Sequence, residues 1–130
     1  MMQCPCCSLL PYAMCCRPLH DDERTASNAL ALMRSRYSAY ALKKAEYIIN
    51  TFVVEERRDQ NRFDIEVSFA NTTWTRLEIL KVYSEKEHQR VQFAAFCTRG
   101  NREFVLKEDS AFRKDEEGWR YWGLKSRPMT

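Results

Sequence analysis

Five of the six cysteines of this chain lie within its first sixteen residues, in the stretch MMQCPCCSLLPYAMCC. Cys4 and Cys6 form one close pair, and Cys15 and Cys16 form a second pair after eight intervening residues. A short loop with this spacing can fold back and place four thiolates around one ion. Four sulfur ligands in a tetrahedron suit zinc, and closed four-coordinate sites of this kind are structural. We therefore predict one zinc ion bound by these four cysteines.

Disulfides are the alternative chemistry for so many cysteines, and six cysteines allow 15 pairings. They need an oxidising compartment. The start of the chain lacks the cationic segment and the run of about 7 to 15 apolar residues that a secretory signal shows. We therefore expect a cytoplasmic protein with reduced thiols, which favours the metal site over the disulfides.

The pattern C-x-C-x8-C-C at positions 4–16, followed by RPLH, resembles the SEC-C motif, a small zinc-binding segment also found at the C-terminus of the protein-export ATPase SecA. The resemblance implies that the same four cysteines are the ligands. Three neighbours also match residues that are common in the family: Pro5, Ser8 and Tyr12.

Two positions depart from the SEC-C pattern. Cys7 and Leu9 stand where the family usually has glycines, which adopt a positive φ without strain. We therefore expect the loop to turn differently, with Cys7 competing with Cys6 for the ion. His20 is a further candidate ligand, although a single histidine near a zinc finger is more often solvated. The assignment to the four cysteines is kept.

The 130 residues suffice for one domain with a hydrophobic core, to which the cysteine segment is appended. We place the SEC-C segment at residues 1–20 and an α+β domain at residues 25–127. The net charge is +1 in residues 1–60 and +2 in residues 61–130. Because this charge is not concentrated, nucleic acid is not an expected partner. No run of 18 apolar residues predicts a membrane span.

Helical spacing begins after a polar linker at 17–24. The side chains that repeat along the first predicted helix and share one face are Leu30, Met33, Tyr37, Tyr40 and Ala41. Three residues are candidates to cap its N-terminus: Thr25, Ser27 and Asn28. A second helix is predicted over residues 43–52, followed by an exposed helical turn and a loop.

Residues 63–69 alternate between apolar and polar side chains, which predicts a half-buried strand, although so short a stretch could equally be the end of a helix. Further strands are predicted at 74–83, 91–98, 102–113 and 119–124. Short turns join them, so successive strands must pair antiparallel. Helices followed by an antiparallel sheet give an α+β fold.

These stretches resemble, in order, the domain of the YchJ-type SEC-C proteins, a bacterial family of uncharacterised role. The matching segments are LMRSRYSAY at 32–40, YIINTF at 47–52, WTRLEIL at 74–80, VQFAAF at 91–96 and SAFRKDEEGWRYWGL at 110–124. The resemblance implies a nuclear transport factor 2-like cone, in which helices pack on a strongly curved sheet. The chain stops soon after Trp122, so we do not expect the second, C-terminal SEC-C segment of some relatives.

The interior of such a cone can hold a site for a small molecule, and relatives of this general fold include isomerases and dehydratases. The candidate pocket residues are Arg34, Arg36, Tyr37, Tyr40, Glu78 and Glu108. The simpler alternative is a closed core of aromatic side chains, with the arginine stems lying on apolar surface at its edge. The sequence does not tell which face of its strand Glu78 takes. Neither His20 in the linker nor His88 in a hydrophilic turn suits a buried catalytic pair.

Two functions follow. The first is a cytoplasmic zinc-binding protein, either a monomer or a homodimer, whose finger and cone bind another protein or other macromolecule. The alternative is a small-molecule-binding protein, or an isomerase-like or dehydratase-like enzyme, that uses the interior of the cone. No catalytic residue is assigned, and we favour the first. Cys97 lies on an apolar alternation and is expected to be a small buried hydrophobe.

Overall fold

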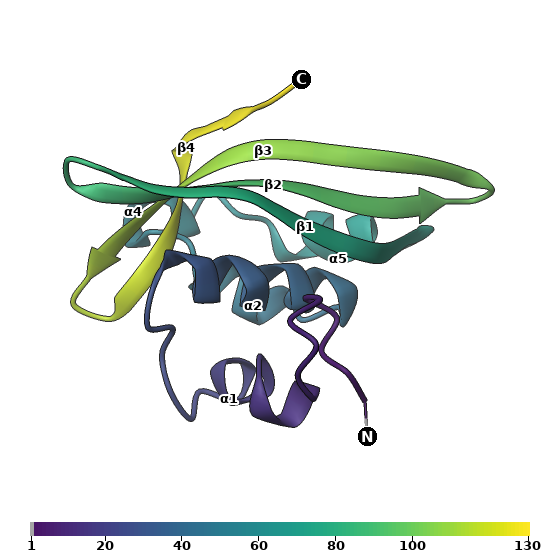
Figure 1. The fold of residues 1–130 in the computed structure, drawn as a ribbon, viewed down its shortest axis with the longest axis horizontal. Coiled ribbons are helices and arrows are strands. Elements are labelled where there is room, and N and C mark those ends of the chain that lie inside the picture. Colours follow the sequence, from purple (N-terminus) through teal and green to yellow (C-terminus); the bar gives the residue numbers. More distant parts are fainter. Residues whose placement is uncertain (1) are drawn as a thin grey trace.

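The computed structural model describes residues 2–130. Its helical elements are η1 (Tyr12–Met14), α1 (Arg17–His20), α2 (Ala29–Ala41), α3 (Ala45–Asn50), α4 (Val54–Arg57) and α5 (Arg62–Phe69). Its strands are β1 (Thr72–Glu85), β2 (His88–Arg99), β3 (Arg102–Asp115) and β4 (Gly118–Pro128). Figure 1 shows the helices on one side of the sheet, with the hairpin of β3 and β4 bent down beside α2. The predicted α+β fold is confirmed.

The sheet has the order β1-β2-β3-β4, and every neighbouring pair is antiparallel. Two-residue turns at 86–87, 100–101 and 116–117 join the strands. The turn at 100–101 uses Gly100 at φ 62°, a left-handed angle that glycine takes without a side-chain clash. The short turn and antiparallel pairing predicted between the strands at 91–98 and 102–113 are therefore confirmed.

A bend near the end of β4 redirects the C-terminal segment. Trp122 lies opposite Ala111, whereas Arg127 lies opposite Asp109, so residues 123–126 bulge out of the register. The buried carboxylate of Glu56 accepts hydrogen bonds from the backbone nitrogens of residues 123 and 124, at 2.9 and 3.2 Å. Beyond this bend, the chain lies on the side of the sheet away from α2 (Figure 1).

Residues 62–69 form α5, so the strand predicted at 63–69 is wrong and the helical alternative is the one observed. Asn61 caps the helix, because its side chain accepts a hydrogen bond from the backbone nitrogen of Asp64 at 3.1 Å. Phe63 and Val67 are exposed, and Phe69 packs with the side chains of α3. The alternation of apolar residues therefore does not mark a buried strand face.

The main core lies between α2 and the inner face of the sheet. Leu32, Met33 and Tyr37 of α2 pack in one buried cluster with Phe93 and Phe112 of the strands. Of the three candidate caps, Asn28 is the one used, since its side chain accepts from the backbone nitrogen of residue 31 at 2.8 Å. Packing of an amphipathic face gives most of a helix's stability in a protein, so α2 depends on the sheet.

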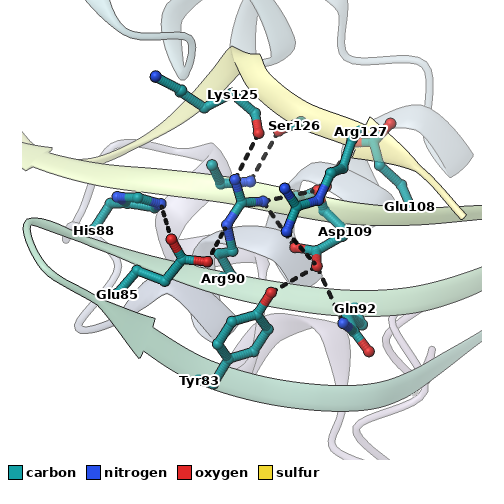
Figure 2. Close-up of polar contacts among 12 residues, drawn as sticks. Tyr83, Glu85, His88, Arg90, Gln92, Glu108, Asp109, Lys125, Ser126 and Arg127 are labelled. Carbon is teal, nitrogen blue, oxygen red and sulfur yellow. Dashed lines mark hydrogen bonds and ion pairs between the residues drawn. The ribbon is translucent and has the colours of Figure 1, made fainter.

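A polar network occupies the other face of the sheet (Figure 2). Arg90 and Asp109 are both buried, and their side chains form an ion pair at 2.8 Å. Tyr83 and Gln92 donate hydrogen bonds to the same carboxylate, at 2.7 and 3.1 Å. Arg90 also donates to the backbone oxygen of Lys125 at 2.8 Å. The network thereby fastens the segment beyond the bend of β4 to the sheet.

Within residues 2–130, no helix has the length and apolar character needed to cross a bilayer.

Candidate metal centre and neighbouring cavity

The four cysteines of the predicted site come together in space. The Sγ atoms of Cys4, Cys6, Cys15 and Cys16 all lie within 4.8 Å of one another. The distance from Cys6 to Cys15 is 3.6 Å, and that from Cys15 to Cys16 is 3.9 Å. A tetrahedron with Zn–S bonds of about 2.3 Å places its sulfur atoms about 3.8 Å apart. The cluster therefore has the spacing of four ligands of one metal ion.

Local hydrogen bonds fold the segment into this arrangement. The backbone nitrogen of Cys4 donates to the oxygen of Leu10 at 2.9 Å, which closes the first loop. The backbone nitrogen of Cys15 donates to the oxygen of Tyr12 at 3.0 Å, which closes the turn of η1. Cys16 then precedes α1 as its N-terminal cap residue. Two short turns thus bring the two cysteine pairs together.

Hydroxyl groups surround the sulfur atoms. Ser8 Oγ lies 3.1 Å from Cys15 Sγ. Ser38 Oγ, from α2, lies 3.4 Å from Cys4 Sγ and donates to Cys16 Sγ at 3.4 Å. Groups that hydrogen-bond metal ligands fix their orientation. Sequence reasoning missed Ser38, although serine on a buried helix face, three residues after Ser35, is a signal that a polar partner lies opposite.

The ionisation of the thiols also depends on this packing. Burial raises the pKa of the Cys15 thiol to about 11. Hydrogen bonding with Cys4 raises the pKa of Cys16, whereas hydrogen bonding with Cys16 lowers the pKa of Cys6. Without an ion, these shared hydrogen bonds thus favour a thiolate in the cluster, held by neighbouring thiols. Metal ions bind thiolates, so a divalent cation would displace the remaining protons.

Neither of the two competing ligand candidates joins the cluster. Cys7 Sγ accepts a hydrogen bond from the backbone nitrogen of Leu77 in β1 at 3.5 Å, and it is absent from the cluster of four within the described residues. Cys7 and Leu9 have φ angles of 66° and 72°. The backbone therefore takes, at both positions, left-handed angles of the kind that glycine favours.

His20 is half-buried rather than solvated, so that expectation is wrong. Its Nε2 lies 2.8 Å from the backbone oxygen of Ser35, and its Nδ1 lies 2.6 Å from the hydroxyl of Tyr12. A carbonyl oxygen only accepts, so Nε2 carries the proton and Nδ1 accepts from the tyrosine. Burial lowers the pKa of His20. Both nitrogens are thus occupied in joining the cysteine segment to α2.

Of the six candidate pocket residues, the structure brings four together and leaves two outside. A cavity of about 200 Å³ lies between α2 and the inner face of the sheet, and Arg36, Tyr37, Tyr40 and Glu108 line it. Arg34 instead donates from Nη1 to the backbone oxygen of Cys6 at 2.7 Å. Glu78 forms an ion pair with Arg76 at 2.6 Å on the surface. These two residues therefore do not belong to the cavity.

The other cysteine, Cys97, is buried in β2, as its apolar surroundings in the sequence indicate. Trp119 and Tyr121 pack against the main core, whereas Trp122 contacts His88 edge to face at 5.6 Å between ring centroids. Tyr121 is the member of this aromatic group that lines the cavity, and sequence reasoning did not place it there.

With this geometry established, the chain can be placed among known proteins. It matches the family described as "YchJ, middle NTF2-like domain" over residues 28–123, which is most of its length. The chain belongs to the YchJ family. The family resemblance inferred from the sequence is therefore confirmed, and so is the nuclear transport factor 2-like domain.

Similar proteins include YchJ-family relatives from several bacteria. A UPF0225 protein of Actinobacillus succinogenes is 36% identical over 89% of this chain and 77% of its own length. A UPF0225 protein of Vibrio cholerae is 34% identical over 92% of this chain and 80% of its own length.

Two solved structures resemble the chain over nearly its whole length. The solution structure of a SEC-C motif containing protein from Rhodopseudomonas palustris is 32% identical, covers 99% of this chain and 100% of its own, and has a TM-score of 0.89. The crystal structure of such a protein from Psychrobacter arcticus is 28% identical, covers 98% and 84%, and has a TM-score of 0.83. Together with the four thiols, these SEC-C relatives indicate a cysteine cluster that could hold a metal ion.

Proposed function

We propose that this YchJ-family chain binds one structural zinc ion through Cys4, Cys6, Cys15 and Cys16. The observation that carries the proposal is the spacing of the four Sγ atoms, all within 4.8 Å of one another. Four thiolates suit zinc better than hard cations such as calcium or magnesium, which prefer oxygen ligands. With four protein ligands no coordination position is left open, so the ion has a structural role.

Zinc would hold together a segment that has little apolar packing of its own. Metal binding supplies roughly 10 to 16 kcal/mol in zinc-finger peptides, against about 1 to 2 kcal/mol of backbone entropy for each residue that becomes ordered. Three of the four sulfur ligands, Cys4, Cys6 and Cys16, are buried in the same core as α2. The ion would therefore stabilise the contact between the finger and the cone as well as the finger itself.

The test is the metal content of the purified reduced protein. We expect about one zinc per chain, and loss of that zinc in the double variant Cys15→Ser and Cys16→Ser, because two of four ligands are removed. Cys7→Ser is the matched control, since Cys7 lies in the same segment but outside the cluster, and it should keep the ion. Full zinc occupancy in the double variant would refute the four-cysteine site.

We further propose that the finger binds another protein through its exposed apolar side chains. The exposed apolar residues of the finger are Met2, Leu9, Leu10 and Met14. The finger is held on α2 by Arg34, Ser38 and His20, so it offers these side chains from a fixed position. Four large apolar side chains are thus exposed within one short segment, and exposed apolar surface of this kind is typical of interaction sites.

This role can be separated from metal binding. The double variant Leu10→Ser and Met14→Ser changes two exposed side chains and no ligand, so its zinc content should equal that of the wild type. Candidate partners are captured with the wild type, purified, and tested for direct binding to it. We expect each such partner to bind the variant at least about tenfold more weakly, since apolar anchors carry much of the affinity of an interface. Equal binding by both proteins would argue against the finger as the docking surface.

A further inference from the structure

The cavity inside the cone is lined by both apolar and polar side chains. The apolar side chains that line it are Met33, Trp74, Phe93, Ala95 and Leu106. The polar side chains that line it are Arg36, Tyr37, Tyr40, Glu108, Ser110 and Tyr121. A mostly apolar concave site with a few convergent polar groups is the usual form of a small-molecule site.

Arg36 is a buried cation that has no carboxylate within ion-pair distance in the described part of the chain. Its side chain belongs to a residue only 5% exposed, and it forms no ion pair within residues 2–130. Nη1 donates to the backbone oxygen of Ile48 at 2.8 Å and to Thr51 Oγ1 at 2.6 Å. Nε and Nη2 make no hydrogen bond to the described part of the chain. Burying a charge without a direct counter-ion is costly. Glu108 lines the same cavity but forms no ion pair with Arg36, so a ligand carboxylate on Nε or Nη2 would supply the direct contact that Glu108 does not.

Aromatic rings hold this guanidinium in place. Its Cζ lies 4.6 Å from the ring centroid of Phe52 and 4.4 Å from that of Tyr121. Such cation–π contacts attract the guanidinium and fix the plane of the group. Arg36 is therefore oriented before any ligand arrives, which lowers the entropic cost of binding.

Glu108 supplies the second polar group of the cavity. Its Oε1 accepts from Ser110 Oγ at 2.5 Å and from the Tyr121 hydroxyl at 2.7 Å, whereas Oε2 has no hydrogen-bond partner among residues 2–130. The ring of Tyr121 thus stands between Glu108 and Arg36, touching the guanidinium with its face and the carboxylate with its hydroxyl. A ligand in this cavity could therefore donate a hydrogen bond to Oε2 of Glu108 and accept one from the guanidinium of Arg36.

We infer that the cavity binds a small organic acid with an apolar body and a hydrogen-bond donor beside its carboxylate, the chemistry of an apolar α-amino or α-hydroxy acid. The carboxylate would accept from Arg36, and the amino or hydroxyl group would donate to Glu108. The apolar body would lie on Met33, Trp74 and Phe93. The cavity volume of about 200 Å³ is smaller than the roughly 300 to 1,000 Å³ of clefts for drug-sized ligands. The ligand is therefore limited to a molecule about as large as a single amino acid.

The test uses L-leucine and 2-hydroxy-4-methylpentanoate as probes of the zinc-loaded full chain. We expect both to shift the NMR signals of the Ala95 and Met33 methyl groups and to give saturable binding. Two matched molecules each lack one polar group: 4-methylpentanoate has no donor, and 3-methylbutylamine has no carboxylate. 3-Methylbutylamine should bind at least about tenfold more weakly than L-leucine, because it leaves Arg36 without an anion.

Three variants locate the site. Arg36→Met should weaken both probes by about tenfold or more, and Ala95→Leu should block them by filling the cavity while both charged groups stay in place. Glu78→Gln, on the same sheet but outside the cavity, should bind as the wild type does. Absence of any shift at Ala95 and Met33 in the wild type overturns the inference whatever the variants do. Unchanged binding in folded Ala95→Leu, or an amine that binds as well as the acids, also overturns it.

Discussion

Cys7 and Leu9 have left-handed backbone angles at the two positions where SEC-C segments usually carry glycine. A side chain in this region costs roughly 1 to 2 kcal/mol because Cβ crowds the following carbonyl group. Cys7 gains a contact with the backbone of β1 in exchange, but the Leu9 side chain is exposed. Leu9 is therefore a residue whose type conflicts with its conformation.

Leu9→Gly is predicted to stabilise the finger. Relief of the left-handed strain should outweigh the extra freedom of glycine in the unfolded chain, for a net gain of about 0.5 to 1 kcal/mol. Zinc affinity, measured by competition with a chelator, should rise by about twofold to fivefold. Leu9→Ala is the control, since it removes the side chain but keeps Cβ, and it should give no such gain. A weaker affinity for the glycine variant would contradict the strain argument.

Helix α2 connects the two candidate sites. The hydroxyl of its Ser38 contacts the sulfur atoms of the cysteine segment, and the backbone oxygen of its Ser35 accepts from His20. Its Arg36 reaches the cavity on another side. Residues two apart on a helix differ by about 200° in direction, because each residue turns the helix by about 100°. One helix can therefore hold the finger with one face and line the cavity with another.

Ser38→Ala is predicted to weaken zinc binding by about 10-fold to 100-fold, the usual effect of removing a group that orients metal ligands. Ser35→Ala is the matched control, because Ser35 is equally buried on the same helix but bonds Tyr47 and Leu32 instead of sulfur. The control should lower the free energy of unfolding and leave zinc affinity unchanged. If both variants lose zinc affinity equally, the effect belongs to helix stability and not to the sulfur contacts.

At the scale of the whole molecule, the end of the chain is tied to the outer face of the sheet by Arg90 and Asp109 (Figure 2). Burial alone would raise the pKa of Asp109, but hydrogen bonds from Tyr83, Gln92 and Arg90 outweigh it, so the pKa is lowered. The pKa of this carboxyl group is therefore lower in the folded protein than in the unfolded chain. Its contribution to stability is complete above about pH 4 and is lost as the pH falls below that value.

Asp109→Asn is predicted to lower the free energy of unfolding by about 3 kcal/mol at pH 7, because Arg90 loses its buried counter-ion. In urea titrations, the difference between wild type and variant should shrink below about pH 4, where Asp109 takes up a proton in the unfolded chain before it does so in the folded protein. Glu78→Gln, which removes a surface ion pair with Arg76, should cost no more than about 1 kcal/mol. A difference that stays constant down to pH 2 would exclude the proposed titration of Asp109.

The order of elements and the ligand pattern could be read from the residues because they depend on local properties. Apolar spacing along Leu30, Met33 and Tyr37 marks a helix whatever the helix packs on. Short turns force antiparallel neighbours, and two cysteine pairs separated by eight intervening residues close a loop with little chain between them. The fold class, the family and the four clustered thiols were therefore accessible from the sequence alone.

Tertiary structure decided the questions that depend on distant neighbours. Residues 63–69 alternate like a strand, yet the cap at Asn61 and the contact of Phe69 with α3 accompany a helix. Likewise His20 meets Ser35 across fifteen residues, and Arg36 enters the cavity while Arg34 turns to the finger. The periodicity of apolar residues assigns a side chain to one face of its own helix or strand. Only the tertiary packing determines which other residues that face contacts.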